Sequence, residues 1–320
     1  MADLPAIESV TVGAIYAAYE ANRREEWFGN IGMSAFGNEC DRSLWYDWRK
    51  AAPPEQLDGR KLRLFETGHR EEERLVADLK HQAGIPVQDR DPATGKQFKV
   101  TCLGGHVSGR LDGRAFGIPE APKTEHVVEV KTHNEKSFKA LVKSGVEKSK
   151  PGHFAQMTFY MHLSGLTRAL YVACNKNDEA IYTERVEYDP AQAIALVARA
   201  ERIVAAVSPP MRLHEDPTSK AAFACGWCPA RSLCHAGEFA RRHCRTCLHA
   251  TPVVGDGDAS LWRCERLKAD LTPQAQAVGC ALHLYIPGLV PGEQVDADLD
   301  AETVTYALTN GTTWVDGDRP

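Results

Sequence analysis

The alternation of hydrophobic and polar residues predicts helices and strands in turn along the first part of the chain. Apolar residues recur at helical spacing over residues 11–26 and 61–81, and Pro53-Pro54 separates the two segments. Short β-type runs broken by turn residues occupy residues 87–117, and residues 127–132 form the strongest strand. The first part therefore predicts two helices followed by strands.

The pattern continues in the second part. We predict helices over residues 135–144, 151–163 and 191–207, and strands over residues 170–174 and 180–186. The order helix, strands, helix, strand, helix favours an α/β core whose sheet is flanked by helices.

Composition suggests where the chain divides. After Pro209-Pro210 the residues Cys, His, Arg and Trp become frequent, and Asn310-Gly311 near the end is typical of a tight hairpin. We expect four parts: an N-terminal helical segment carrying one cluster cysteine at 1–60, an α/β core at 61–208, a cysteine segment at 209–243, and a zinc-ribbon-like module with a terminal hairpin at 244–320.

Composition and charge narrow the class of protein. No stretch of the 320 residues is apolar enough for a membrane span and no signal peptide is evident, so we expect a soluble protein of the cytoplasm, bacterial or that of a phage-infected host. In a reducing compartment ten cysteines indicate metal binding more than disulfides. The net charge of −5 argues against coating by nucleic acid but leaves room for a local basic groove.

The stretch HVVEVKT at residues 126–132 carries two opposite charges in an apolar run. Residues two apart in a strand share a face, so Glu129 and Lys131 point one way while Val128 and Val130 point into packing. Burying such a pair is costly unless the charges are matched or bind something. The strand is therefore a candidate site.

A second carboxylate precedes this strand. Asp112 ends a β-type segment in the run Gly109-Arg-Leu-Asp112, next to a permissive glycine. Two carboxylates brought together disfavour each other's charge unless a cation lies between them, and Mg²⁺ accepts such a ligand set. A lysine beside the metal could orient or deprotonate an attacking water.

These residues resemble the active site of the PD-(D/E)XK nucleases. The pattern Gly109-x-x-Asp112 followed by Glu129-x-Lys131 is the family variant in which glycine replaces the proline of the name. The resemblance implies that Asp112, Glu129 and the Val130 carbonyl hold Mg²⁺ or Mn²⁺, with Lys131 acting on the water.

Two further motifs extend the resemblance in the family's order. Glu72, on the preceding predicted helix, matches the acidic first motif of exonucleases of the phage-lambda type, and would support the metal directly or through water. Gln156-Met-Thr-Phe-Tyr160 resembles the Gln-x-x-x-Tyr motif of RecB-type nucleases, whose two side chains would orient substrate and site. The resemblance implies a DNA exonuclease acting at single- or double-stranded ends in recombination, repair or phage DNA processing, with a strand-annealing or recombination protein as its partner.

Each motif has a plainer interpretation when taken alone. Glu129 and Lys131 could form a cross-strand ion pair on a half-exposed sheet, Glu72 could be a solvated helix residue, and Gln156 a surface amide. For the nearby histidines, His69, His106 and His153, we expect structural or DNA-facing roles, because a Mg²⁺ site of carboxylates needs no imidazole.

One group of cysteines spans the predicted core. Cys225, Cys228 and Cys234 follow the core, and Cys40 before it is the expected fourth member. This arrangement resembles the iron–sulfur nucleases of the AddB type and of CRISPR spacer acquisition, in which a 4Fe-4S cluster joins the two ends of the domain. Zinc is the alternative occupant, since four cysteines also suit Zn²⁺.

A second group follows at Cys244, Cys247, Cys264 and Cys280. Its spacing is typical of a zinc-ribbon-like knuckle in which His249 or His283 could replace one ligand; the alternative is unrelated buried thiols. Cys102 and Cys174 lie in β-type runs and are expected to be small core residues.

Lysines follow the candidate strand and could neutralise DNA phosphates without reading bases. Without the nuclease motifs, a solvated helix face would be the simpler interpretation. Two other hypotheses remain: an inactive nuclease fold that binds DNA, and a structural subunit stapled by its iron–sulfur cluster. The lysines expected to bind DNA are Lys136, Lys139, Lys143, Lys148 and Lys150.

Overall fold

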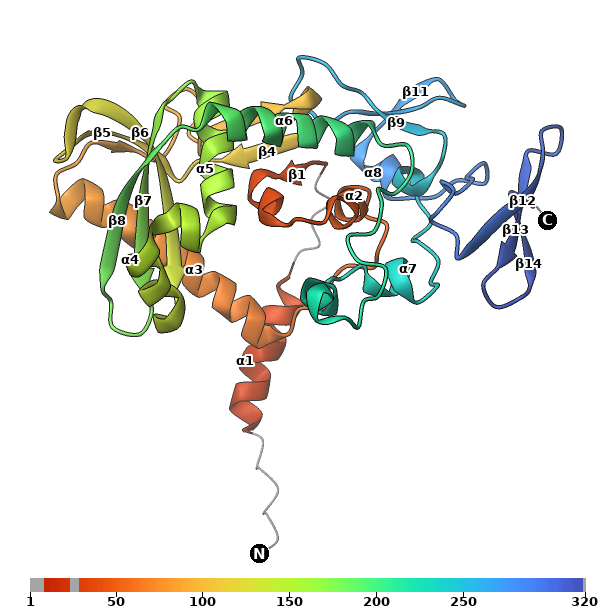
Figure 1. Ribbon diagram of the computed structural model, residues 1–320, viewed down its shortest axis with the longest axis horizontal. Helices are drawn as coiled ribbons and strands as arrows, with labels where there is room; N and C mark the ends of the chain where they lie inside the picture. Colours follow the sequence, from red (N-terminus) through yellow and green to blue (C-terminus); the bar gives the residue numbers. More distant parts are fainter. Residues whose placement is uncertain (1–8, 24–28, 319–320) are drawn as a thin grey trace, which may run out of the picture.

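The computed structural model describes residues 9–23 and 29–318. It confirms the predicted α/β fold class, because a central mixed sheet is flanked by helices and followed by cysteine-rich segments (Figure 1). The α-helices are α1 (Val10–Ala21), α2 (Asp41–Trp48), α3 (Gly59–Ala77), α4 (Glu135–Ser149), α5 (Pro151–Ser164), α6 (Pro190–Ala205), α7 (Arg231–His235) and α8 (Pro273–Gln276).

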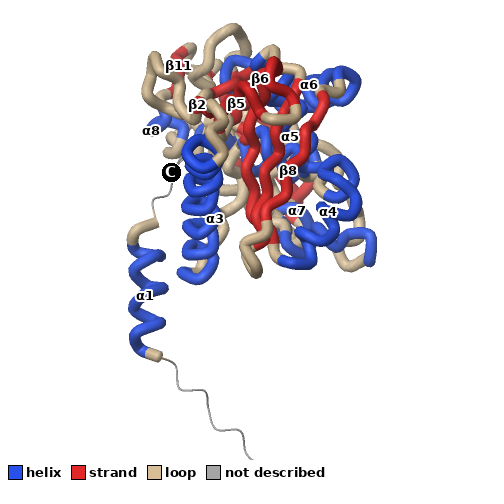
Figure 2. Tube along the Cα trace, turned by 90° about the vertical axis from the view of Figure 1, so that its left-hand side faces the viewer, coloured by secondary structure: helices blue, strands red, loops and turns tan. Residues whose placement is uncertain are grey.

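The central sheet has the strand order β2-β5-β6-β7-β8. Only the β6–β7 pair is parallel, so the chain must cross over between these strands, and α4 and α5 make that connection. Figure 2 shows α3 on one side of the sheet and α4 on the other. The strands are β2 (Val87–Gln88), β5 (Gly113–Ile118), β6 (Ala121–His133), β7 (Arg168–Asn175) and β8 (Ile181–Glu187).

Most predicted elements of the core are present, with changed ends. The strand predicted at 127–132 begins six residues earlier, and the helix predicted at 135–144 runs on to Ser149 through a kink at Gly145, whose φ is +73°. The first predicted helix is observed as α1, and its expected last residues, 24–26, lie outside the described residues. Helix periodicity therefore located these elements better than it located their termini.

The two faces of β6 belong to different hydrophobic cores. Val128 and Val130 pack with Leu75 and Val76 of α3. The opposite face contributes to the larger core beneath α5 and α6. The strict alternation along β6 is what allows one strand to serve both cores.

The N-terminal segment packs against the cysteine-rich part of the chain. Trp48, at the end of α2, lies with its ring centroid 4.9 Å from that of Trp262, and both side chains are fully buried. The Arg245 guanidinium donates to the Trp48 carbonyl at 2.7 Å, and the Arg49 guanidinium donates to the Arg245 carbonyl at 3.0 Å. Segments about 200 residues apart in the chain therefore share one core.

Three small sheets complete the fold, with the orders β1-β4-β3, β11-β10-β9 and β12-β13-β14. The hairpin predicted at Asn310-Gly311 is confirmed between β13 and β14. No helix among the described residues is long and apolar enough to cross a membrane. The strands are β1 (Ile31–Gly32), β3 (Lys99–Cys102), β4 (Val107–Arg110), β9 (Ala250–Pro252), β10 (Trp262–Cys264), β11 (Ala269–Leu271), β12 (Gly292–Asp298), β13 (Thr303–Leu308) and β14 (Thr313–Asp316).

Candidate active site

The predicted site residues come together from three elements. Glu72 lies on α3, Asp112 lies in the bend between β4 and β5, and Glu129 and Lys131 lie on β6. The backbone N–H of Val130 donates to Asp112 Oδ2 at 2.7 Å, which fixes this carboxylate beside the strand. The fold thus brings together residues that are up to 59 positions apart in the chain.

Lys131 binds two oxygens of the site. Its ammonium group contacts Glu129 Oε1 and donates to the Val130 carbonyl at 3.1 Å. These oxygens belong to two of the groups that the resemblance assigns to a metal ion. The Glu129 carboxylate and the Val130 carbonyl therefore already bind one positively charged group, the Lys131 ammonium.

The ion pair between Glu129 and Lys131 is present, but Glu129 is fully buried and only the lysine side chain, at 29%, is partly exposed. The second oxygen of Glu129, Oε2, is buried and has no hydrogen-bond partner among the described residues. A buried carboxylate oxygen without a donor is costly, and a bound cation would relieve that cost. This orphaned oxygen fits a divalent ion better than it fits a purely structural pair.

Burial and mutual repulsion shift the acidity of the carboxylates. Burial raises the pKa of Glu129 to about 8, against the opposing charge of Lys131. Burial and the neighbouring Asp112 raise the pKa of Glu72 to about 7, and burial likewise raises the pKa of Asp112. Burial alone would lower the pKa of Lys131, but the charges of Glu129 and Asp112 outweigh it and the pKa is raised. Three crowded acids with one ammonium are the electrostatic setting that a divalent cation stabilises.

Gln156 and Tyr160 lie on one face of α5, as their spacing predicts. Gln156 Nε2 donates to the Tyr160 hydroxyl at 2.9 Å, and both side chains are buried. A Cβ atom on Gly109 would lie 2.3 Å from Tyr160 Cε1. Gly109 is therefore required because the Tyr160 ring packs directly on its backbone, next to Asp112.

A buried polar network adjoins the site, and the sequence did not reveal its centre, Tyr171. The Tyr171 hydroxyl lies 2.9 Å from His133 Nε2 and 2.8 Å from His153 Nδ1, and Tyr171 is the β7 partner of Glu129. Burial, helped by the nearby lysines, lowers the pKa of His133 to about 4 and that of His153 to about 3. Both histidines are thus neutral members of a structural network, as we expected for His153.

The other two histidines differ from each other. His106 is buried between Trp48 and Trp262, with ring centroids 5.6 Å from each, so its position is structural. His69 lies exposed on α3, in the turn before Glu72. The positions of His106 and His69 are therefore explained without metal binding.

The predicted DNA-binding lysines belong to α4 and its C-terminal end. Lys136, Lys139, Lys143 and Lys148 are exposed, and the ammonium group of Lys139 pairs with Glu135 at 2.5 Å. Lys150 is half-buried and lies close enough to lower the pKa of His133 and His153. Lys150 is therefore the member of this set that adjoins the buried network beside the site.

The first four cysteines converge although one of them precedes the core. Cys40, Cys225, Cys228 and Cys234 line one small cavity, and burial together with the charges of the other three raises the pKa of Cys225. Ser43 N donates to Cys40 Sγ at 3.4 Å, and Ser43 Oγ lies 3.6 Å from Cys228 Sγ. Three arginines, Arg42, Arg212 and Arg231, line the same cavity, so the surroundings suit thiolates.

The second four cysteines also lie together. Burial and the charges of Cys247, Cys280 and Cys264 raise the pKa of Cys244 to about 11. His283 Nε2 lies 3.4 Å from Thr246 Oγ1, whereas His249 Nε2 has no hydrogen-bond partner among the described residues. The four thiols are thus close enough to influence one another's charge, although no three of the four sulfur atoms lie within 4.8 Å of one another. His249 and His283 lie on adjoining segments.

Metal-ligand spacing also identifies a group that the sequence did not suggest. Among the described residues, one set of three possible ligand atoms lies within 4.8 Å, formed by Glu71, Cys174 and Glu179. Cys174 is buried in the core beneath α3, as expected, but its thiol also meets Glu71 on that helix. Arg74 forms ion pairs with both glutamates, so one of the two negative charges of this group is already offset.

Comparison with known proteins gives weak structural similarities. No family model matches the chain, and no curated protein matches it. An alkaline exonuclease from Laribacter hongkongensis is similar with 17% identity over 59% of this chain and 91% of its own, at a TM-score of 0.38. Its complex with dAMP gives 17% identity, 60% and 91% coverage and the same TM-score of 0.38. The protein SSO0001 gives 14% identity, 71% and 96% coverage and a TM-score of 0.42.

Proposed function

We propose that the protein is a Mg²⁺- or Mn²⁺-dependent deoxyribonuclease, an exonuclease that hydrolyses phosphodiester bonds at DNA ends. The observation that carries the proposal is the buried Glu129, with one oxygen bound by Lys131 and the other without a donor, beside the Asp112 carboxylate. Such an arrangement of acids and one lysine around a vacant lone pair is suited to metal-assisted hydrolysis.

The metal ligands would come from the strand and the bend. Asp112, Glu129 and the Val130 carbonyl would hold the ion, and Glu72 would support it directly or through water. The bound ion would stabilise negative charge on a phosphoryl oxygen and acidify a water. Lys131 would orient that water. It could accept the water's proton only as a neutral amine, which a bound ion would favour by adding positive charge and by taking over the Glu129 and Val130 oxygens.

Two sets of residues would position the substrate and the site. Gln156 and Tyr160 are buried against each other, so they would act by holding the bend of Gly109 and Asp112 in place. The exposed α4 lysines and Lys150 would neutralise phosphates of single- or double-stranded DNA that reaches the carboxylates.

For the cysteine groups we propose two different occupants. Cys40, Cys225, Cys228 and Cys234 would hold a 4Fe-4S cluster, which would staple the N-terminal segment to the segment after the core. Support comes from the convergence of a cysteine before the core with three after it on one arginine-lined cavity. Cys244, Cys247, Cys264 and Cys280 would hold Zn²⁺. Iron, sulfide and zinc analysis of the purified protein distinguishes these assignments from zinc in both sites.

The division of the chain and its biological setting are also proposals. We propose the boundaries given above, with the nuclease core at 61–208, the cysteine segment at 209–243 and a terminal module at 244–320. We also propose the cytoplasm, bacterial or that of a phage-infected host, as the location, because the close cysteine spacings suit metal binding in a reducing compartment. End resection in recombination, repair or phage DNA processing, together with a strand-annealing partner, would suit an exonuclease of this kind.

Digestion of end-labelled linear DNA tests the proposed function. We expect cleavage of single- or double-stranded substrate that requires Mg²⁺ or Mn²⁺, and no cleavage by Lys131→Ala. Lys123→Ala is the matched control, because this lysine lies on the same strand, β6, but is exposed and is not among the residues proposed to bind metal or DNA. DNA binding without cleavage in either metal would contradict the proposal and favour an inactive, DNA-binding nuclease fold.

A further inference from the structure

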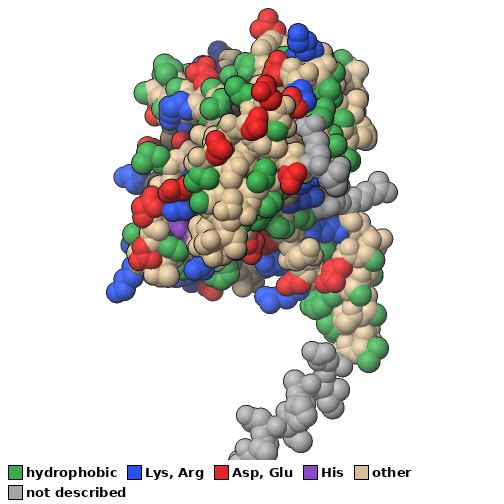
Figure 3. Space-filling view, turned by 90° about the vertical axis from the view of Figure 1, so that its right-hand side faces the viewer, with side chains coloured by type: hydrophobic (Ala, Val, Ile, Leu, Met, Phe, Trp, Pro, Cys, Tyr) green, Lys and Arg blue, Asp and Glu red, His purple; other side chains and the backbone are tan. Residues whose placement is uncertain are grey.

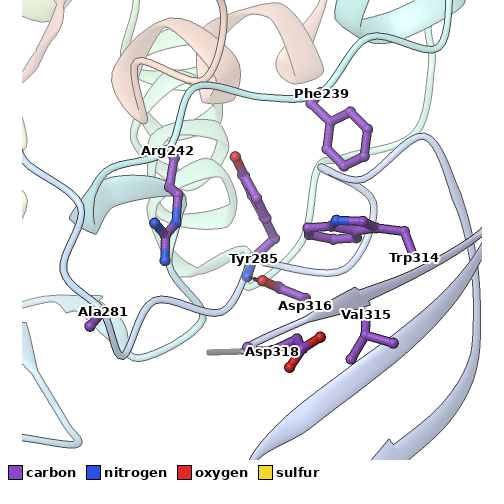
Figure 4. Close-up of a pocket in the computed structure, with 9 residues that line it drawn as sticks. Phe239, Arg242, Ala281, Tyr285, Trp314, Val315, Asp316 and Asp318 are labelled. Atoms are coloured by element: carbon purple, nitrogen blue, oxygen red, sulfur yellow. Dashed lines mark hydrogen bonds between the residues drawn. The ribbon is translucent and has the colours of Figure 1, made fainter. Parts of the chain in front are cut away.

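A pocket is lined by Trp314, Val315 and Asp316 of strand β14 together with residues of the cysteine-rich part of the chain. Figure 1 shows β14 at the opposite end of the molecule from strand β6, which carries Glu129. The volume of the pocket is about 450 Å³, within the usual range for ligand pockets. Figure 4 shows Tyr285 between two walls, with Phe239 and Trp314 on one side and Arg242 on the other. The pocket therefore has one wall of aromatic rings.

The rings of the aromatic wall are held in place by contacts with one another and with a neighbouring backbone carbonyl. The Phe239 and Trp314 rings meet edge to face with centroids 5.1 Å apart, and Tyr285 lies 6.3 Å from Phe239 and 6.1 Å from Trp314. The Tyr285 hydroxyl donates to the Ala240 carbonyl at 3.0 Å, which fixes its ring. Such a preformed wall presents ring faces at little entropic cost on binding.

Two carboxylates complete the pocket. Asp316 is 3% exposed, and its Oδ2 accepts the backbone N–H of Tyr285 at 2.5 Å, whereas Asp318 is exposed. Neither carboxylate forms an ion pair with any residue that the structure describes. Among the described residues, Arg242 is the one cation that lines the pocket, and it donates to the Cys280 carbonyl at 3.2 Å. The lining therefore has an excess of negative charge.

The surface around the pocket is also negatively charged. Residues 292–318 contain seven Asp and Glu and no Lys or Arg. Strand β12 is exposed over nearly all of its length and carries Glu293, Asp296 and Asp298. Figure 3, which faces this end of the molecule, shows acidic side chains across the middle of the surface and basic ones mostly toward its margins. This surface repels phosphates and attracts cations.

We propose that this pocket binds a lysine or arginine side chain from a basic segment of a partner protein. The side-chain stem would pack on Trp314 and Phe239, the cation would face the rings and the carboxylates of Asp316 and Asp318, and the acidic strand would attract further basic residues. A nucleic acid would fit the rings but not the surrounding charge. The proposal does not depend on nuclease activity.

Fluorescence polarisation with a labelled hexa-arginine peptide tests the proposal on the full chain without divalent metal. We expect Trp314→Ala to weaken binding about tenfold, through loss of the ring face, and Asp318→Asn about threefold. Arg242→Gln should strengthen binding about threefold, because it removes the one lining cation. Glu120→Gln, an exposed turn residue between β5 and β6, is the matched charge control and should leave binding unchanged.

A labelled single-stranded oligonucleotide serves as the competing probe. If the pocket instead takes a nucleobase, Trp314→Ala weakens oligonucleotide binding, Arg242→Gln weakens it further, and peptide binding is unaffected; this result overturns the proposal. Equal peptide binding by Trp314→Ala, Glu120→Gln and the unaltered protein also overturns it, since only general surface charge would then remain. Circular dichroism establishes that each variant is folded, and Asp318→Asn gives a second test at a solvent-exposed position if Trp314→Ala is not.

Discussion

Two groups of carboxylates lie at opposite ends of the molecule in opposite environments (Figure 1). Glu129 is fully buried in the central sheet, where desolvation raises its pKa to about 8. Glu293, Asp296 and Asp298 are exposed on β12. The same chemical group therefore needs a cation at close range in the first place and only water in the second.

The difference teaches how charge can be used in this protein. A buried carboxylate costs stability until a nearby cation, a raised pKa or a bound ligand neutralises it. Exposed carboxylates cost little one by one and act through their sum, as a field that selects the sign of a partner. Changes at the two ends should therefore have different consequences.

The largest expected effect is on DNA cleavage, which should depend on the buried Glu129 but not on the exposed carboxylates of β12. Glu129→Gln keeps the size of the side chain but removes a metal-binding charge, and we expect cleavage of linear DNA to fall by about a hundredfold or more. Glu125→Gln, on the same strand, removes only a partly exposed pair with Arg114 at 2.8 Å and should retain activity. The Asp296→Asn, Asp298→Asn double variant should also cleave normally. Equal loss in all three variants would contradict a local catalytic role for Glu129.

The next largest effect is on metal binding, which should require Glu129 but not the exposed carboxylates of β12. Mg²⁺ or Mn²⁺ at about one hundred times its dissociation constant should stabilise the unaltered protein by about 2.7 kcal/mol, because the ion binds only the folded site. Thermal unfolding measures this as a rise in Tm. Glu129→Gln should lose most of the rise, whereas the Asp296→Asn, Asp298→Asn double variant should keep it. A rise of the same size in Glu129→Gln would place the stabilising ion elsewhere.

Two glycines test how rigidly each region is built. Gly109→Ala should cost about 1–3 kcal/mol, since its Cβ would collide with the Tyr160 ring, and should also lower cleavage by shifting Asp112. Gly311→Ala in the C-terminal hairpin has open space around it but a φ of +84°, so it should cost about 1 kcal/mol through the backbone alone. Denaturant unfolding measures both costs.

A second substitution identifies the cause at each glycine. Tyr160→Phe removes the hydroxyl but keeps the ring, so it should not rescue Gly109→Ala, whereas Tyr160→Leu should rescue part of its stability. Gly311→Asn should cost less than Gly311→Ala, because asparagine tolerates a positive φ. The opposite ranking at either position would contradict the assigned cause.

Local sequence patterns were enough to locate the core elements and the candidate site. The periodicities of α3, α5, α6 and β6–β8 depend on neighbouring residues, so they could be read directly. The proximity of Asp112 to Glu129 and Lys131 could be predicted for the same reason, because one short strand, β5, joins the bend that holds Asp112 to strand β6. For Glu129 and Lys131 on β6, the alternation of side chains along a strand was enough to predict that both point to the same face.

Features made by distant segments could not be predicted in this way. The Tyr171 hydroxyl contacts His133, which is 38 residues away in the sequence. The Trp262 ring packs against the Trp48 ring, although most of the chain lies between them in the sequence. The pocket of Phe239, Tyr285 and Trp314 likewise depends on three segments that no short-range pattern connects. Such contacts depend on how distant segments pack. A single sequence therefore shows which residues are present but not which residues they contact.

The smallest expected effect concerns stability at the exposed end. The Asp296→Asn, Asp298→Asn double variant should change the free energy of unfolding by less than about 0.5 kcal/mol, because both side chains are solvated and form no ion pair among the described residues. If the acidic surface serves a basic partner, the same variant should weaken hexa-arginine binding and flatten its dependence on salt. Urea unfolding and salt-dependent polarisation measure the two quantities on one preparation. A large stability change would mean that these carboxylates support the sheet, whereas an unchanged fold with a lost salt dependence would show that they act on a partner at a distance.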